Sequence, residues 1–162
     1  DGIAGMMAAA ERGEVAPMYS GGYESRSADI EAGAGRSADD LVADVRTSIY
    51  RLEQTWAGLS PTGWQGHGMM VTGEVAVVQL PWRRWREAEV HRIDLGRGYR
   101  FTDLPAEYVR LELVALNAQW ASRKPMGLTE LPAAALALAP ADRLAWLTGR
   151  AVVDGLEPAG IF

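Results

Sequence analysis

The chain has 162 residues, a net charge of −5 at neutral pH and no cysteine. A chain of this length can bury enough surface to fold as one domain without a disulfide or a structural metal. Its acidic balance disfavours nucleic acid as a partner, and the lack of cysteine excludes thiolate metal ligands and cysteine nucleophiles. No segment reaches the roughly 18 apolar residues of a membrane helix. We therefore expect a cytoplasmic protein with no membrane partner.

The first segment predicts a helix that runs to about Arg12 and ends at Gly13, since apolar residues recur at positions 3, 6, 7 and 10. The chain opens inside this pattern without a methionine. Two interpretations are open: Asp1 caps a short first helix, or the chain is a fragment that lacks sequence before Asp1.

The middle of the chain predicts a short helix over residues 25–33 and a long one that Ser37 opens. Ser37 can cap the helix, Asp39 and Asp40 favour its first turn, and apolar residues follow at positions 41, 45, 49, 52, 56 and 59. Residues 60–68 are expected to form a loop. Residues 69–78 are apolar and interrupted at Thr72-Gly73, so a small hairpin and an extended connector are both open.

Three further helices are predicted towards the C-terminus. One starts with Pro81 in its first turn and stops at Gly96, one starts at Asp103 with an apolar stripe at positions 109, 113, 116 and 120, and a short one starts at Pro140. The predicted fold is mainly all-α: an antiparallel four-helix bundle over residues 1–124, with a short C-terminal tail containing one helix over residues 125–162.

The helix that begins at Pro81 has an unusual stripe, because Glu87 and His91 stand where apolar residues are expected. Trp82 and Trp85 should draw this helix towards the core and could carry the stripe inward. At i and i+4 a carboxylate oxygen and an imidazole nitrogen can share one divalent cation, and zinc suits this ligand pair. The alternative is an ordinary helical Glu–His pair. His67, in a glycine-flanked loop, is either a third ligand or a solvated histidine.

Residues 80–96, with the sequence LPWRRWREAEVHRIDLG, resemble the signature helix of the mycothiol-dependent maleylpyruvate isomerase family, metal-binding relatives of the DinB-like bundles. The resemblance extends to RGEVAPMY at residues 12–19, to the helix that Ser37 opens, to DLP at 103–105 and to AWLTGR at 145–150.

The resemblance implies a zinc site in which Glu87 and His91 are two ligands and a histidine of an earlier helix is the third. The first helix of the family's bundle, and the part of its second helix that carries this histidine, would precede Asp1, which favours the fragment interpretation and predicts an exposed apolar groove. Arg150 matches the arginine of the family's closing Gly-Arg motif, so the resemblance implies a catalytic role for Arg150.

Three functions follow as expectations. The first is a zinc- and mycothiol-dependent cis–trans isomerase that converts maleylpyruvate to fumarylpyruvate by thiol addition and elimination, with a small-molecule thiol and an unsaturated oxo-acid as partners. The second is a mycothiol S-transferase of the same fold that acts on another electrophile. The third is a non-catalytic helical binding module. Four arginines near the Glu–His pair, Arg83, Arg84, Arg86 and Arg92, are either a solvated face or anchors for an acidic ligand.

Overall fold

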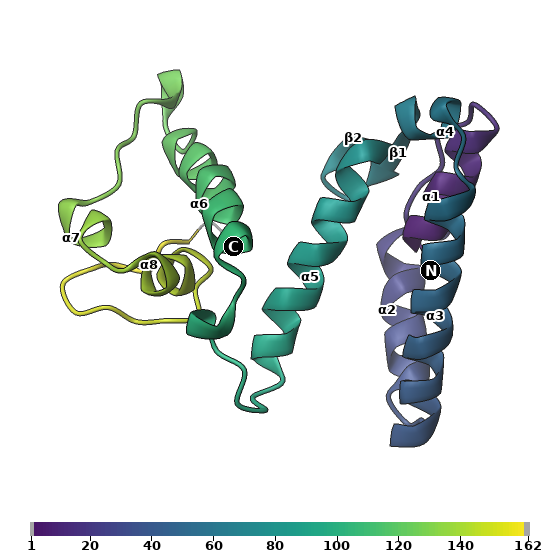
Figure 1. Cartoon of the computed structure of the whole chain (residues 1–162), viewed down its shortest axis with the longest axis horizontal. Helices are drawn as coiled ribbons and strands as arrows, with labels where there is room; N and C mark the ends of the chain where they lie inside the picture. The colour runs from purple at the N-terminus through teal and green to yellow at the C-terminus, as the bar shows by residue number, and fades with distance from the viewer. Residues whose placement is uncertain (1, 161–162) are drawn as a thin grey trace. The chain divides into compact units, whose positions relative to one another are not determined.

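The computed structural model describes residues 2–160, except for the side chain of Pro125 (Figure 1). Over these residues the chain is mainly helical, as predicted, with two short strands. It divides into two compact units, Asp1–Arg84 and Trp85–Phe162. The expected four-helix bundle arrangement and the domain boundary after residue 124 stay predictions. No helix of residues 2–160 has the length and apolar character to cross a membrane.

The first unit is built around helix α1 (Gly2–Glu11), which packs against α3 (Ala38–Gly58), α4 (Pro61–Gln65) and strand β1 (His67–Met70). Its core includes Met6, Met7 and Leu80. Gly13 has a φ of 74°, so it ends the first helix as predicted. The alternative that Asp1 caps this helix lies outside the described residues.

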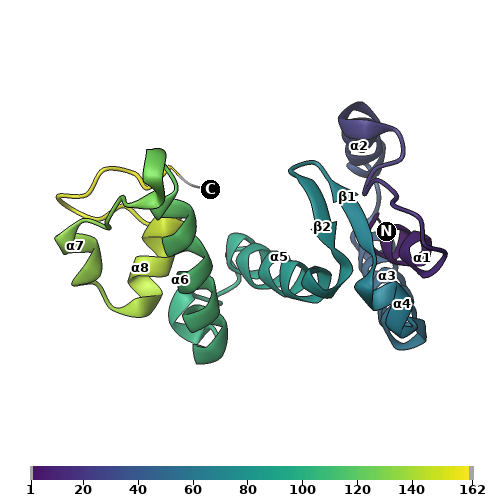
Figure 2. The same cartoon turned by 90° about the horizontal axis from the view of Figure 1, so that it is seen from above.

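A small hairpin, one of the two alternatives that the sequence left open, follows α4 in this unit. Strand β1 pairs antiparallel with β2 (Gly73–Ala76), and Gly73 has a φ of 118° at the turn. The hairpin is drawn beside α1 and α4 (Figure 2). The prediction that residues 60–68 are all loop is wrong, because Ser60 caps the short helix α4 with Pro61 in its first turn, and His67 begins β1.

Helices α2 (Gly22–Gly33) and α3 agree with the predicted helices in position but not in burial. Ser37 accepts a hydrogen bond from the Asp40 backbone N–H, as predicted for the α3 cap. The apolar stripe of α3 is expected in the core, but Leu52 is its only fully buried residue, and Val45 remains 54% exposed. None of the described residues of α2 is buried. Much of the apolar face of α3 is therefore in solvent.

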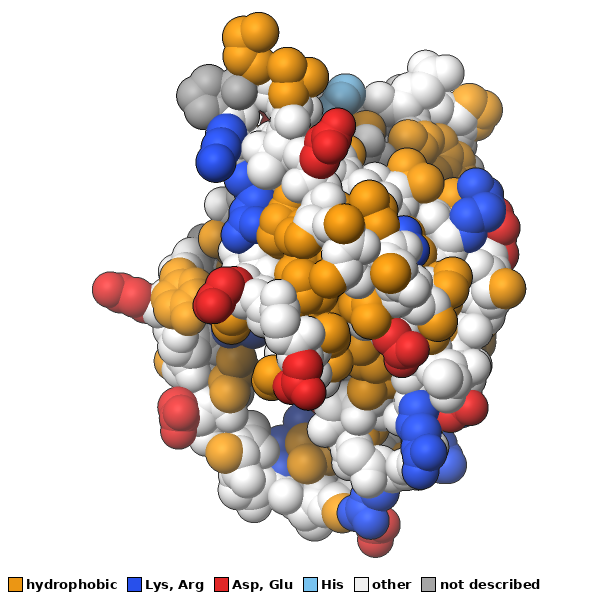
Figure 3. All heavy atoms as spheres, turned by 90° about the vertical axis from the view of Figure 1, so that its left-hand side faces the viewer, with side chains coloured by type: hydrophobic (Ala, Val, Ile, Leu, Met, Phe, Trp, Pro, Cys, Tyr) orange, Lys and Arg blue, Asp and Glu red, His pale blue; other side chains and the backbone are white. Residues whose placement is uncertain are grey.

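The second unit contains most of α5 (Leu80–Asp94), the turn η2 (Phe101–Asp103), α6 (Ala106–Ala121), η3 (Pro125–Gly127), α7 (Ala133–Leu136) and α8 (Pro140–Leu147). Helices α6 and α8 lie against each other in both views (Figures 1 and 2). The rings of Trp120 and Trp146 pack 5.2 Å apart between these two helices. In Figure 3, hydrophobic side chains gather in the middle of the side that shows this unit.

Helix α6 begins later than predicted and buries most of its predicted stripe together with a neighbouring carboxylate. Pro105 adopts extended backbone angles as the N-cap, so the helix starts at Ala106 and Asp103 closes the preceding turn. Three of the four residues of the predicted stripe, at positions 109, 116 and 120, are buried, and Leu113 is half-buried. Beside them, Tyr108 and Glu112 are completely buried, which the stripe did not predict. This brings a carboxylate into the interior of the unit.

Candidate functional site

The candidate site lies on the last two turns of α5. Glu87 and His91 extend from the same side of the helix, with Oε2 of Glu87 3.1 Å from Nε2 of His91. The expected side-by-side placement is confirmed. The possibility that the stripe turns inward is wrong, since the Glu87 and His91 side chains are 58% and 65% exposed.

Asp94, which was not predicted from the sequence, is the next residue of this network. Its Oδ2 lies 3.0 Å from Nδ1 of His91. In the tautomer that donates from Nδ1 to this carboxylate, Nε2 carries the lone pair that can bind a metal ion. The spacing offered a signal: Asp94 follows His91 by three residues and so lies on the same helical face.

Arg150 completes the network from the other end of the unit. Its Nε and one terminal nitrogen donate to the two oxygens of Asp94, each at 2.8 Å, and its other terminal nitrogen donates to the Thr148 carbonyl. Gly149, with a φ of 72°, turns the chain just before Arg150. The Thr148 hydroxyl bonds two carbonyls of α8 and so anchors this turn.

The electrostatics of Asp94 follow from this contact. The hydrogen bonds from Arg150, and to a lesser extent from His91, lower the pKa of Asp94 to about 2. The same pairing raises the pKa of Arg150. Both groups are therefore charged at neutral pH, and the network joins Glu87, His91, Asp94 and Arg150 without a break.

The other arginines near the site have different environments. Arg86 forms an ion pair with buried Glu112, with Nε and Oε1 2.5 Å apart. Arg92 lies 3.7 Å above the ring of Tyr99. Arg83 and Arg84 are half-buried. Arg86 and Arg92 are thus held by neighbouring side chains of this unit, which weakens the interpretation that all four arginines anchor an acidic ligand.

The Glu87–His91 pair has the donor chemistry of a zinc site. A carboxylate oxygen and an imidazole nitrogen are typical zinc ligands, and a carboxylate on the second ring nitrogen is the usual partner of a metal-binding histidine. Among residues 2–160 there is no group of three His, Cys, Asp or Glu side chains that could hold a metal ion. The pair fits two ligands of such a site and leaves the third unidentified.

His67, the residue considered as a third ligand, lies on β1 in the first unit. Its Nδ1 is 3.9 Å from Oε1 of Glu74 across the hairpin, and both side chains are about half exposed. Its contacts indicate a solvated histidine of a hairpin. The alternative role of His67 as a third metal ligand stays a hypothesis.

Comparison with known proteins places this arrangement in context. Residues 1–96 match the family model described as the mycothiol maleylpyruvate isomerase N-terminal domain. No curated protein matches the chain. Two solved structures do: the mycothiol-dependent maleylpyruvate isomerase and a histidine-to-alanine mutant of it. Each has 24% sequence identity and a TM-score of 0.79, covering 93% of this chain and 69% of the other.

These structures show the same fold, and the family model covers more than half of the chain, including the Glu87–His91 pair and Asp94. The chain therefore belongs to the mycothiol maleylpyruvate isomerase N-terminal domain family.

Proposed function

We propose that this protein is a zinc- and mycothiol-dependent isomerase that converts maleylpyruvate, or a closely similar unsaturated oxo-acid, to the trans isomer. The observation that carries the proposal is the continuous network from Glu87 through His91 and Asp94 to Arg150. It joins a candidate metal-binding pair to a guanidinium that can recognise a carboxylate. The two solved structures of similar fold are those of the mycothiol-dependent maleylpyruvate isomerase and of its histidine-to-alanine mutant.

Glu87 and His91 would hold the metal through Oε2 and Nε2, the two atoms that already face each other. Asp94 would keep the His91 ring in the tautomer that leaves Nε2 free to bind. Zinc bound there would supply the positive charge that lowers the pKa of the mycothiol thiol. Addition of the thiolate to the cis double bond, rotation about the resulting single bond and elimination of the thiolate would then give the trans product.

Arg150 would bind the acidic substrate. Its side chain is 23% exposed, and Asp94 together with the Thr148 carbonyl fixes the guanidinium plane. A planar guanidinium held in this way can donate further hydrogen bonds to a substrate carboxylate or to the negative charge that develops during addition. Asp94 thus links the orientation of the metal ligand to that of the substrate-binding cation.

The test is an assay of maleylpyruvate isomerisation with and without mycothiol, together with the zinc content of the protein. We expect conversion that needs both zinc and the thiol, and we expect His91→Ala and Glu87→Ala to lose zinc and activity together. His67→Ala is the matched control, since it removes the second of the two histidines and should leave both unchanged.

The outcomes separate the alternatives. Activity that survives complete removal of metal would refute the mechanism. If the protein binds zinc and consumes mycothiol with a different electrophile, but does not isomerise maleylpyruvate, the S-transferase is favoured. Neither zinc nor thiol binding would favour a non-catalytic binding module.

A further inference from the structure

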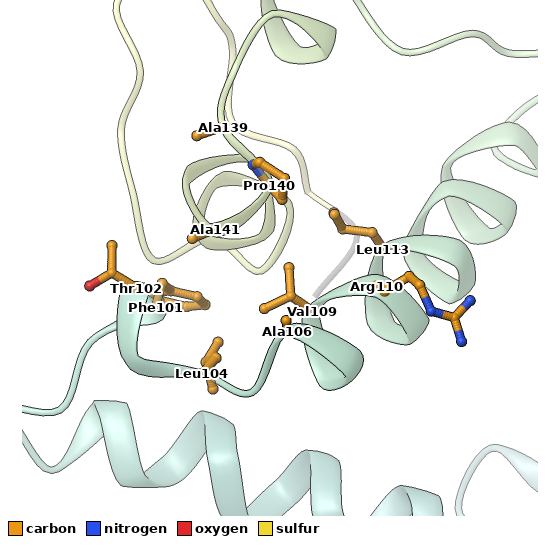
Figure 4. Close-up of a pocket in the computed structure, with 10 residues that line it drawn as sticks. All are labelled: Phe101, Thr102, Leu104, Ala106, Val109, Arg110, Leu113, Ala139, Pro140 and Ala141. Carbon is orange, nitrogen blue, oxygen red and sulfur yellow. The ribbon is translucent and has the colours of Figure 1, made fainter.

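The second unit contains a pocket of about 600 Å³ that none of the four network residues lines. Its walls come from η2, from the first two turns of α6 and from the start of α8 (Figure 4). On α6 the lining residues, at positions 106, 109, 110 and 113, recur at i, i+3, i+4 and i+7 and therefore form one face of the helix. The volume is within the roughly 300–1,000 Å³ of small-molecule sites.

The lining of this pocket is apolar. Phe101, Leu104 and Leu113 contribute large hydrophobic side chains, and the α8 wall consists of two alanines and a proline. Thr102 is the one uncharged polar residue among the lining residues, and in Figure 4 its hydroxyl is directed away from the Phe101 ring.

Arg110 is the one charged lining residue, and its charge is engaged elsewhere. Its guanidinium donates to both carboxylate oxygens of Glu107, at 2.9 and 2.6 Å. In Figure 4 the guanidinium extends away from the other labelled side chains, so Arg110 offers the pocket mainly its aliphatic part. A charged ligand on this lining would gain no charged partner in exchange for the water that it gives up. The lining therefore selects against charged ligands.

The walls are held in place before any ligand binds. The Asp103 carboxylate accepts a hydrogen bond from the Arg100 backbone N–H at 2.9 Å and closes η2. Arg143 donates to the carbonyls of Leu136 and Leu138, which fixes the chain just before the α8 wall. A pocket formed in advance avoids most of the ordering cost of binding.

We propose that this pocket binds an uncharged, largely apolar small molecule. The proposal does not rest on the isomerase function, because the pocket shares no lining residue with the Glu87–Arg150 network.

The experiment compares 1-naphthol with 1-naphthoate, which have the same ring system but differ in charge at neutral pH. Calorimetric titration of the wild-type chain should show one molecule of 1-naphthol bound per chain, with 1-naphthoate at least about tenfold weaker, which corresponds to about 1.4 kcal/mol. Equal affinity for the two probes, no binding of 1-naphthol, or several molecules bound per chain would each overturn the proposal.

Two substitutions locate the binding site. Ala106→Phe and Ala141→Phe fill the pocket from opposite walls, and neither alanine is fully buried, so the core of the unit stays intact. Each should weaken 1-naphthol binding at least about tenfold. Ala118→Phe, at an exposed position of α6 that does not line the pocket, is the matched control. If the filled variants keep the wild-type circular dichroism and thermal midpoint and still bind 1-naphthol as the wild type does, the assignment to this pocket is wrong.

Discussion

Helix α5 has ionic contacts on two of its sides, and these contacts differ in their exposure to solvent. On one side Arg86 pairs with Glu112, whose side chain is completely buried on α6. On the other, Glu87, His91 and Asp94 form their network with more than a third of each side chain exposed. Burial raises the pKa of Glu112, whereas the hydrogen bonds from Arg150 lower that of Asp94.

We propose that this difference separates a pair that stabilises the fold from a network that binds ligands. A buried ion pair is costly to break, because the remaining charge has no water to solvate it. An exposed network contributes little to folding but can exchange partners with a small molecule. We therefore expect the Arg86–Glu112 side of α5 to control stability and the Glu87–Asp94 side to control binding.

The largest expected effect is on the buried side. Glu112→Leu leaves the Arg86 guanidinium without its buried carboxylate and should lower the free energy of unfolding by about 3–5 kcal/mol. Urea unfolding, followed by tryptophan fluorescence, measures this loss.

The control for this prediction is the double variant Arg86→Met/Glu112→Leu. Replacing both charges by apolar groups of similar size is often neutral or stabilising, so this variant should recover most of the lost stability. If the double variant is as unstable as Glu112→Leu alone, the loss comes from packing and the buried pair is not its cause.

The local features of this fold could be predicted from the sequence because short-range geometry determines them. The Ser37 cap depends on a contact three residues away, and the approach of Glu87 to His91 follows from the helical repeat. The resemblance to the family, carried by residues 80–96, was confirmed by the family model.

Long-range features could not be predicted in the same way. Arg150 reaches Asp94 across 56 residues, and no spacing rule links them. Periodicity shows that α3 has an apolar face but not what covers it, which is why the exposure of Val45 was missed. On α6 the periodicity predicts the burial of positions 109, 116 and 120 but gives no sign that the Glu112 carboxylate is buried beside them.

The second prediction concerns Asp94 as the partner of His91. Asp94→Asn keeps the size of the side chain but weakens its hold on the imidazole, so zinc affinity, measured by competition with a chelator, should fall by about 10–100-fold. Asp142→Asn, at an exposed position of α8, is the control. Unchanged zinc affinity in Asp94→Asn would show that Asp94 does not orient a metal ligand.

The third prediction separates substrate binding from metal binding. Arg150→Lys keeps the positive charge but loses the planar fork that donates to both oxygens of Asp94. Isomerase activity should fall by about tenfold or more, equivalent to about 1.4 kcal/mol, while zinc content stays the same. Arg97→Lys, at an exposed position after α5, should have normal activity. A normal rate for Arg150→Lys would reduce Arg150 to a structural role.

The smallest expected effect is the pH dependence of stability that comes from Asp94. Its pKa is about 2 in the folded chain, below the value of about 3.9 for an unfolded chain. The unfolded state therefore binds the proton first as pH falls. The contribution of the Asp94–Arg150 pair should be complete above about pH 4 and should disappear as the pH falls towards 2.

Because the Asp94 side chain is 37% exposed, this contribution should be less than about 1 kcal/mol. The measurement is the difference in unfolding free energy between the wild type and Asp94→Asn at a series of pH values, which cancels the acid sensitivity of the other carboxylates. We expect the two curves to converge below about pH 4. Parallel curves over this range would mean that the exposed side of α5 makes no ionic contribution to folding. Ionic stabilisation by α5 would then come from its Arg86–Glu112 side alone.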